Sequence, residues 1–94
     1  MWYIYILECS DGSFYTGITT DIDRRVTEHN RKKGGGYTRA RLPVKLIYKE
    51  PCKSHSRALK REIEIKSWSR EKKLCLIDSN KADPFTVSIS KKRY

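Results

Sequence analysis

Even and odd positions differ in two short runs near the start of the chain, at residues 2–9 and 13–19. The odd positions include Tyr3, Tyr5 and Tyr15, and the even positions include Ile4, Ile6, Phe14 and Ile18. A period of two is typical of β-strands that turn one face toward a core. The tripeptide Ser10-Asp11-Gly12 between the runs consists of turn-forming residues. The pattern therefore predicts an antiparallel β-hairpin.

The length of the hairpin loop decides whether Tyr5 and Tyr15 share a face. A two-residue loop would place them on opposite faces, because side chains alternate along each strand. A three-residue loop, with Gly12 in the left-handed conformation, makes the two phenols diagonal neighbours on one face. We favour the three-residue loop, which also places Gly17 opposite Tyr5. The missing side chain at Gly17 would leave room above the tyrosine ring for a ligand.

The rest of the chain has the spacing and boundary residues of three helices and one more strand. We expect the strand at about 44–50. Both faces of the hairpin are largely apolar, so helices should cover both. The expected fold class is α+β, with a three-stranded antiparallel sheet flanked by helices in the order ββαβαα. The expected helices lie at about 21–33, capped by Thr20 or Asp21, at about 54–68, opened by Ser54 or Ser56, and at about 69–77, capped by Ser69.

The chain is expected to form one domain over residues 1–80, because 94 residues leave little room for a second core. Residues 81–94 have a fading pattern and a basic end, so we expect a disordered tail, with a short strand at 85–89 as the alternative. Residues 34–36 are three glycines and predict a flexible connector. A polar, basic loop is expected at 37–41.

Two residues of the first helix are candidates for chemistry. Arg25 and His29 lie on the same helical stripe as Ile22 and Val26, which should pack on the sheet. The structural alternative for Arg25 is a side chain whose stem covers the core. The alternative for His29 is a cation favoured by the C-terminal end of the helix dipole.

Glu62 is the candidate of the second helix. Its expected neighbours on the inward side are Ala58, Leu59, Ile63 and Ile65. A carboxylate beside apolar residues is costly unless it is paired or holds a cation. Both interpretations stay open: an ion pair with Arg25 or another basic residue, or a metal ligand.

Composition limits the classes of partner. The net charge is +10, from 21 basic and 11 acidic residues, which favours a protein that binds a polyanion. The alternative is a basic protein whose charge serves only its solubility. Tyr37, with Arg39 and Arg41 nearby, could stack on a base and hold phosphates. The alternative for Tyr37 is a loop aromatic packed against the sheet. No apolar run is long enough to span a membrane, and binding to a membrane surface is not expected.

The three cysteines are odd in number and far apart, which argues against a disulfide framework or a zinc site. A reduced, cytoplasmic location is therefore expected.

These residues, in this order, resemble the GIY-YIG nuclease superfamily and in particular its small, stand-alone bacterial members. The tripeptide Tyr3-Ile4-Tyr5 stands at the position of Gly-Ile-Tyr, and Tyr15-Thr16-Gly17 at that of Tyr-Ile-Gly. The resemblance covers residues 2–77. Tyr3 replaces the first glycine of the motif, and Ile18 stands where some members carry a lysine.

The resemblance implies metal-dependent hydrolysis of a nucleic-acid phosphodiester, with DNA expected as the substrate and repair or recombination as the setting. One Mg²⁺ or Mn²⁺ ion would bind Glu62, Arg25 would stabilise the charge of the phosphate, and Tyr15 would contact the phosphate or the water. Tyr5 and His29 are both candidates for the general base. The implied catalytic residues are Tyr5, Tyr15, Arg25, His29 and Glu62, and the candidate nucleic-acid contacts are Gly17, Tyr37, Arg39 and Arg41.

Two other functions fit the same sequence. The domain could be a nucleic-acid-binding module with weak or absent catalysis. It could also be a subunit that a protein partner directs to its target, because most restriction, homing and repair members of the superfamily carry a separate targeting domain.

Overall fold

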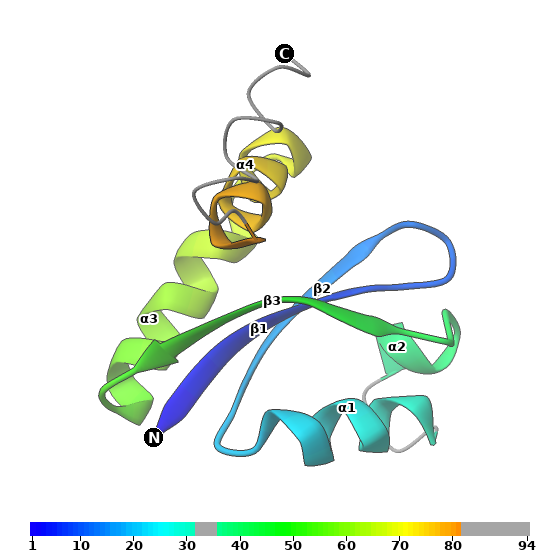
Figure 1. Cartoon of the computed structure of the whole chain (residues 1–94), viewed down its shortest axis with the longest axis horizontal. Coiled ribbons are helices and arrows are strands. Elements are labelled where there is room, and N and C mark those ends of the chain that lie inside the picture. The colour runs from blue at the N-terminus through cyan, green and yellow to red at the C-terminus, as the bar shows by residue number, and fades with distance from the viewer. Residues whose placement is uncertain (32–35, 82–94) are drawn as a thin grey trace.

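The computed structural model describes residues 1–31 and 36–81 of the chain. The predicted α+β class is confirmed: three antiparallel strands in the order β2-β1-β3 are flanked by helices (Figure 1). The elements in chain order are β1 (Trp2–Glu8), β2 (Phe14–Thr19), α1 (Ile22–Asn30), α2 (Gly36–Arg39), β3 (Lys45–Cys52), α3 (His55–Lys66) and α4 (Arg70–Lys81).

The hairpin turn between β1 and β2 has the predicted three-residue loop. The backbone N–H of Cys9 donates to the carbonyl of Ser13 at 2.8 Å, and that of Gly12 donates to the carbonyl of Cys9 at 2.9 Å. Gly12 has φ of 83°, in the left-handed region that glycine adopts without strain. The carboxylate of Asp11 accepts from the N–H of Ser13 at 3.0 Å.

This turn sets the register of the two strands. Tyr5 lies opposite Gly17, and Leu7 lies opposite Tyr15. The two tyrosines are consequently on the same face of the sheet, as the three-residue loop predicts.

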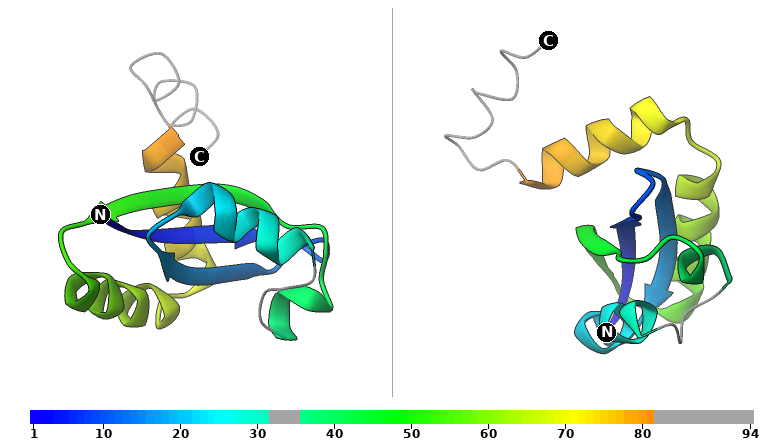
Figure 2. Two further views of the ribbon diagram at one scale, coloured as in Figure 1. Left: turned by 90° about the horizontal axis from the view of Figure 1, so that it is seen from below. Right: turned by 90° about the vertical axis from the view of Figure 1, so that its right-hand side faces the viewer.

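Helices cover both faces of the sheet, as expected, and each face has its own apolar cluster (Figures 1 and 2). One cluster joins the sheet to α3 and α4 and consists of Ile4, Ile6, Tyr48, Ile65 and Ile77. The other joins the tyrosine face to α1 and to the start of β3 and consists of Tyr5, Leu7, Cys9, Ile22 and Val44.

Side chains cap the long helices where the sequence predicts. Each capping oxygen accepts a backbone N–H three residues further on, which satisfies a donor that the helix leaves unpaired. The side chain of Asp21 accepts from the backbone N–H of Arg24 at 3.1 Å, that of Ser54 from Arg57 at 3.2 Å, and that of Ser69 from Lys72 at 3.2 Å.

Several element ends differ from the prediction, and a contact between distant segments explains two of them. α1 ends at Asn30, before residue 33, and β3 begins at Lys45. The side-chain amide of Asn30 bonds both backbone groups of Val44, at 2.9 and 3.1 Å, so Val44 is not part of the strand ladder. β3 continues through Pro51, which an edge strand tolerates.

The expected loop at 37–41 contains the short helix α2, and α4 continues past residue 77 to Lys81. The expected tail from 82 onward, its alternative strand and most of the glycine connector lie outside the described residues. Within the described ranges, no helix has the length and apolar character that crossing a lipid bilayer requires.

Candidate active site

Tyr5 lies in the middle of β1, and its ring covers Gly17 on the neighbouring strand. A Cβ atom built on Gly17 would lie 2.5 Å from the hydroxyl and 2.6 Å from the Cζ of Tyr5. The space that the sequence suggests for a ligand is therefore filled by the tyrosine ring itself, and that expectation is wrong. The residue is 1% exposed. A role of Gly17 in nucleic-acid binding stays a prediction.

Tyr15 is the half-buried neighbour of Tyr5 on the same face. The centroid of its ring lies 6.3 Å from that of Tyr5, 5.2 Å from that of His29 and 6.1 Å from that of Tyr37. Tyr15 thus links the buried tyrosine and histidine to the more exposed ring on α2.

His29 is fully buried at the C-terminal end of α1 and has a hydrogen-bond partner at each ring nitrogen. Nε2 lies 3.1 Å from the hydroxyl of Tyr5, and Nδ1 lies 2.7 Å from Oγ1 of Thr38. Burial lowers the pKa of the imidazole, and the charge of Arg25 lowers it further. Both effects favour the neutral imidazole, which argues against the alternative of a helix-end cation.

Arg25 lies one turn before His29 and points toward the same tyrosine. Its Nη1 is 3.2 Å from the carboxylate of Glu28, and its side chain is 30% exposed. The guanidinium lies close enough to the hydroxyl of Tyr5 to oppose the increase in the pKa of the phenol. A guanidinium in this position can donate to a phosphate without losing its charge.

The hydroxyl of Tyr5 is the point where these groups meet. Burial raises its pKa to about 12, although the nearby guanidinium of Arg25 acts in the opposite direction. The negative charge of Glu62 contributes to the increase, so this carboxylate lies within electrostatic reach of the phenol.

Glu62 lies on the side of α3 that faces the sheet. Its side chain is 17% exposed, and its Oε2 is 3.4 Å from the ammonium of Lys66, one turn further along the helix. Of the two interpretations left open, the structure contains an ion pair with Lys66. A carboxylate that holds an ammonium ion is also a suitable ligand for another cation.

The predicted inward side of α3 is partly wrong. Ala58 and Ile65 are fully buried, but Leu59 is 38% and Ile63 is 68% exposed. The buried stripe runs through positions 58, 61, 62 and 65, because the half-buried Arg61 and Glu62 share it with the two apolar residues.

The candidate nucleic-acid contacts on α2 and after it have structural partners of their own. The guanidinium of Arg41 lies 3.0 Å from Asp11 and 2.9 Å from the carbonyl of Tyr37, and it stacks on the ring of Tyr37 with 4.0 Å to the centroid. Tyr37 is 41% exposed, so its alternative of a packed loop aromatic is only partly realised. Arg39 is exposed and also takes part in an interaction.

The structure adds residues that the sequence does not indicate. Thr38 contacts His29, and a cleft of about 250 Å³ opens beside Tyr15. The cleft is lined by Phe14, Tyr15, Thr16, Tyr37, Lys66 and Lys73. A lysine on a polar helix face and a threonine in a polar segment have no distinctive sequence signal, because their role depends on contacts between distant segments.

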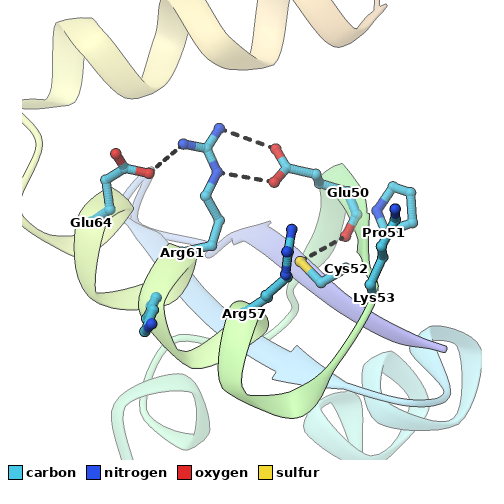
Figure 3. Close-up of a pocket in the computed structure, with 8 residues that line it drawn as sticks. Glu50, Pro51, Cys52, Lys53, Arg57, Arg61 and Glu64 are labelled. Carbon is cyan, nitrogen blue, oxygen red and sulfur yellow. Dashed lines mark hydrogen bonds and ion pairs between the residues drawn. The ribbon is translucent and has the colours of Figure 1, made fainter.

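A larger pocket of about 690 Å³ lies between the end of β3 and α3 (Figure 3). The side chain of Arg61 crosses it, with Nε and Nη2 bonded to the carboxylate of Glu50 at 2.9 and 3.1 Å and Nη1 bonded to Glu64. This guanidinium is held by two carboxylates of the chain itself. The candidate catalytic residues are not among the lining residues of this pocket.

Within residues 1–31 and 36–81, no three side chains of His, Cys, Asp or Glu come together as a ready-made metal site. A hard cation such as Mg²⁺ often binds one carboxylate together with waters and substrate phosphates. Glu62 fits that mode of binding, since its charge is half-buried and already pairs with a cation.

Comparisons with known proteins show the family to which the chain belongs. The family described as the GIY-YIG catalytic domain matches residues 1–74. The chain therefore belongs to the GIY-YIG family.

Its relatives are small bacterial proteins. The chain is 55% identical over 75 residues to a UPF0213 protein of Staphylococcus saprophyticus, which covers 80% of this chain and 92% of the relative. It is 51% identical over 80 residues to a UPF0213 protein of Desulfotalea psychrophila, and the match covers 84% of this chain and 73% of the relative. The solution NMR structure of the UPF0213 protein BH0048 from Bacillus halodurans is similar at 47% identity, with a TM-score of 0.56 and 92% of each chain covered.

Proposed function

We propose that this protein is a metal-dependent endonuclease that hydrolyses phosphodiester bonds in DNA, with DNA repair or recombination as its setting. Membership of the GIY-YIG family supports a nuclease-like domain. The observation that carries the proposal is the hydrogen bond between the Tyr5 hydroxyl and His29, within electrostatic reach of both Arg25 and Glu62. A potential base, a fixed cation and a carboxylate around one hydroxyl are the parts that phosphodiester hydrolysis requires.

The base in this proposal is the pair formed by Tyr5 and His29. A phenol with a pKa of about 12 does not ionise alone at pH 7. A neutral imidazole at 3.1 Å can accept the phenolic proton while the phenol accepts one from water. The two candidates for the base thereby act together.

Arg25 and Glu62 would interact with the charges of the phosphate and of the metal ion. Arg25 would donate to the phosphate oxygens as negative charge develops on them. Glu62 would hold one Mg²⁺ or Mn²⁺ ion, and Lys66 would move from the carboxylate toward a phosphate. The metal, when bound, supplies a Lewis acid for the phosphate and the leaving oxygen.

The cleft beside Tyr15 supplies a path for the nucleic-acid chain. It combines the partly exposed ring of Tyr37 with the ammonium groups of Lys66 and Lys73. Aromatic rings and basic groups side by side are typical of surfaces that hold a base and its neighbouring phosphate. The net charge of +10 favours the approach of DNA.

Replacement of Glu62 tests the proposal. With Mg²⁺ or Mn²⁺ and supercoiled or branched DNA, we expect cutting by the wild type and a loss of at least about 100-fold in kcat for Glu62→Gln. Glu64→Gln is the matched control, because Glu64 lies on the same helix and pairs with Arg61 away from the tyrosines. Equal cutting by wild type and Glu62→Gln would contradict the proposal.

A second candidate function is a nucleic-acid-binding module that does not cut. The burial of Tyr5 and His29, at 1% and 0% exposure, favours it, since water must reach the phenol for hydrolysis. DNA binding without cutting in either metal, unchanged by Glu62→Gln, would support this module. Cutting that begins only when a protein partner is added would support a recruited subunit instead.

A further inference from the structure

A contact between α1 and α2 completes the surroundings of His29. Thr38 and His29 are each 0% exposed, and Oγ1 of Thr38 lies 2.7 Å from Nδ1 of the imidazole. The other ring nitrogen is 3.1 Å from the hydroxyl of Tyr5. Thr38, His29 and Tyr5 therefore form one continuous chain of buried hydrogen bonds.

The direction of these bonds follows from the partners of Tyr5. The hydroxyl of Tyr5 is buried, so its proton needs an acceptor within the protein, and the nearby guanidinium of Arg25 has only donors. Nε2 of His29 is that acceptor. A neutral imidazole whose Nε2 accepts carries its proton on Nδ1, and this proton is donated to Oγ1 of Thr38.

We propose that Thr38 is a positioning residue that holds His29 in the tautomer protonated at Nδ1, with the lone pair of Nε2 directed at Tyr5. This inference rests on the proposed nuclease function and deepens it. Without the acceptor at Nδ1, the opposite tautomer would direct an N–H at Tyr5, and the phenol could not pass on its proton.

The proton and bond changes balance. The oxygen of water bonds to phosphorus as the bond from phosphorus to the leaving deoxyribose oxygen breaks. One water proton moves to the oxygen of Tyr5 while the phenolic proton moves to Nε2 of His29. The leaving oxygen takes a proton from solvent, and the imidazolium returns its extra proton through Tyr5. During the step Thr38 accepts from Nδ1–H and neither gains nor loses a proton.

The surrounding structure keeps Thr38 in place. Its carbonyl accepts from the N–H of Arg41 at 2.9 Å, and the guanidinium of Arg41 bonds Asp11 in the hairpin turn at 3.0 Å. The carbonyl of Arg41 accepts from the N–H of Ser10, in the same turn, at 2.9 Å. The hairpin turn thereby fixes the short helix that carries the threonine against the end of α1 (Figure 2).

The variant pair Thr38→Val and Thr38→Ser tests the inference. Valine has the shape of threonine but no acceptor, whereas serine keeps the hydroxyl. By ¹⁵N NMR of the protein without DNA, we expect the Nδ1–H tautomer in the wild type and in Thr38→Ser. We expect a shift toward the Nε2–H tautomer in Thr38→Val.

The same variants are compared in DNA cutting over a range of pH. Thr38→Val should lower kcat by about 10- to 100-fold, by analogy with the loss of the outer hydrogen-bond partner of a metal-bound histidine. Its acidic limb should move to lower pH, because an imidazolium needs acceptors at both nitrogens and loses one. A merely structural threonine would leave the position of that limb unchanged.

The outcomes separate this inference from the proposed function. A wild-type imidazole protonated at Nε2, or a tautomer that Thr38→Val does not change, overturns the role of Thr38 even if the protein cuts DNA. The expected tautomers without any DNA cutting would refute the nuclease proposal and with it the catalytic use of Thr38. If Thr38→Val does not fold, the wild-type tautomer together with the pH profile of Thr38→Ser decides the question.

Discussion

Tyr5 occupies a core position and a reactive position at the same time. Its ring fills the space above Gly17, and its hydroxyl contacts His29. A residue with both functions makes the packing of the sheet and the geometry of the candidate site depend on each other.

The glycine opposite this ring should be highly sensitive to change. Gly17→Ala would place a Cβ within 2.5 Å of the hydroxyl of Tyr5, so the ring must move. We expect a loss of about 1–3 kcal/mol in the free energy of unfolding, as for other overpacked cores, together with a change in the NMR signals of His29. Urea denaturation and ¹⁵N spectra measure the two effects.

Gly12→Ala is the control for Gly17→Ala. The positive φ of Gly12 makes alanine strained there, but a Cβ at that position meets no described atom within 4 Å. This control should therefore lose stability without altering His29. Unchanged stability and spectra in Gly17→Ala would contradict the packing described for Tyr5.

The burial of His29 predicts how stability depends on pH. Its pKa in the folded protein is below the ordinary value of 6.5, so below pH 6.5 the unfolded chain binds a proton that the folded chain does not. This contribution to stability is complete above pH 6.5 and is lost as the pH falls toward the folded-state pKa, by at most about 1.4 kcal/mol per pH unit.

His29→Gln should remove this dependence, because glutamine does not titrate. We expect the difference in unfolding free energy between the wild type and His29→Gln to become smaller as the pH decreases from 7 to 5. His55→Gln, at the exposed start of α3, replaces the other histidine, which packs on Trp2, and is the control for the loss of an imidazole. If the curves of unfolding free energy against pH are parallel for the wild type and His29→Gln, the lowered pKa of His29 is contradicted.

At the scale of the elements, short-range signals in the sequence determine the hairpin. Gly12, the alternation of the strands and the serine and aspartate caps predict the turn, the register and the starts of three helices, because each depends on neighbours in the chain. The end of α1 and the beginning of β3 could not be predicted in this way, because Asn30 bonds Val44 across fourteen positions.

In the candidate site too, some residues could be predicted from the sequence, whereas others depend on contacts between distant segments. The resemblance provides Tyr5, Tyr15, Arg25, His29 and Glu62, and the structure places Tyr5, Tyr15 and His29 in contact and Arg25 and Glu62 within electrostatic reach of Tyr5. Thr38 could not be found from the sequence, because its partner is nine positions away on another helix. The sequence also could not predict that Ile63 is exposed. The half-buried Arg61 takes an inward position instead, through its bonds to Glu50.

Adjacent lysines on α4 test the proposed path for DNA. Lys73 lines the cleft beside Tyr15, whereas the ammonium of Lys72 lies 4.4 Å from the centroid of the Trp68 ring. Lys73→Ala should weaken binding of a labelled oligonucleotide and reduce the slope of log K against log salt by about 1. Lys72→Ala removes the same charge from the same helix and should change both quantities less.

Binding of the oligonucleotide should be measured in the Glu62→Gln background, so that cutting does not interfere. Equal effects of the two alanine variants would show that the net charge attracts the oligonucleotide without a defined path. Such a result would leave the chemistry proposed for Tyr5 and His29 untouched.

At the scale of the whole molecule, the two sides of the sheet differ in what they can do. The tyrosine face, with α1 and α2, carries the candidate base and Arg25, while α3 packs on the apolar cluster of the opposite face (Figure 1). Glu62 of α3 lies within electrostatic reach of Tyr5. The basic character is spread more widely, since the pocket between β3 and α3 also contains Lys53, Arg57 and Lys60. We therefore expect charge to attract a polyanion to the molecule as a whole, and the proposed hydrolysis uses the tyrosine side.

The burial of Tyr5 and His29 also bears on how such a protein could change over generations. A descendant that no longer needs to cut would still need both residues, because replacing either leaves a void or an unpaired polar group inside the molecule. Arg25 and Glu62 lie nearer to the solvent, so their replacement leaves no comparable defect inside the molecule. In relatives that no longer hydrolyse DNA, we therefore expect substitutions first at these two outer positions. Tyr5 and His29 should still be present in such relatives.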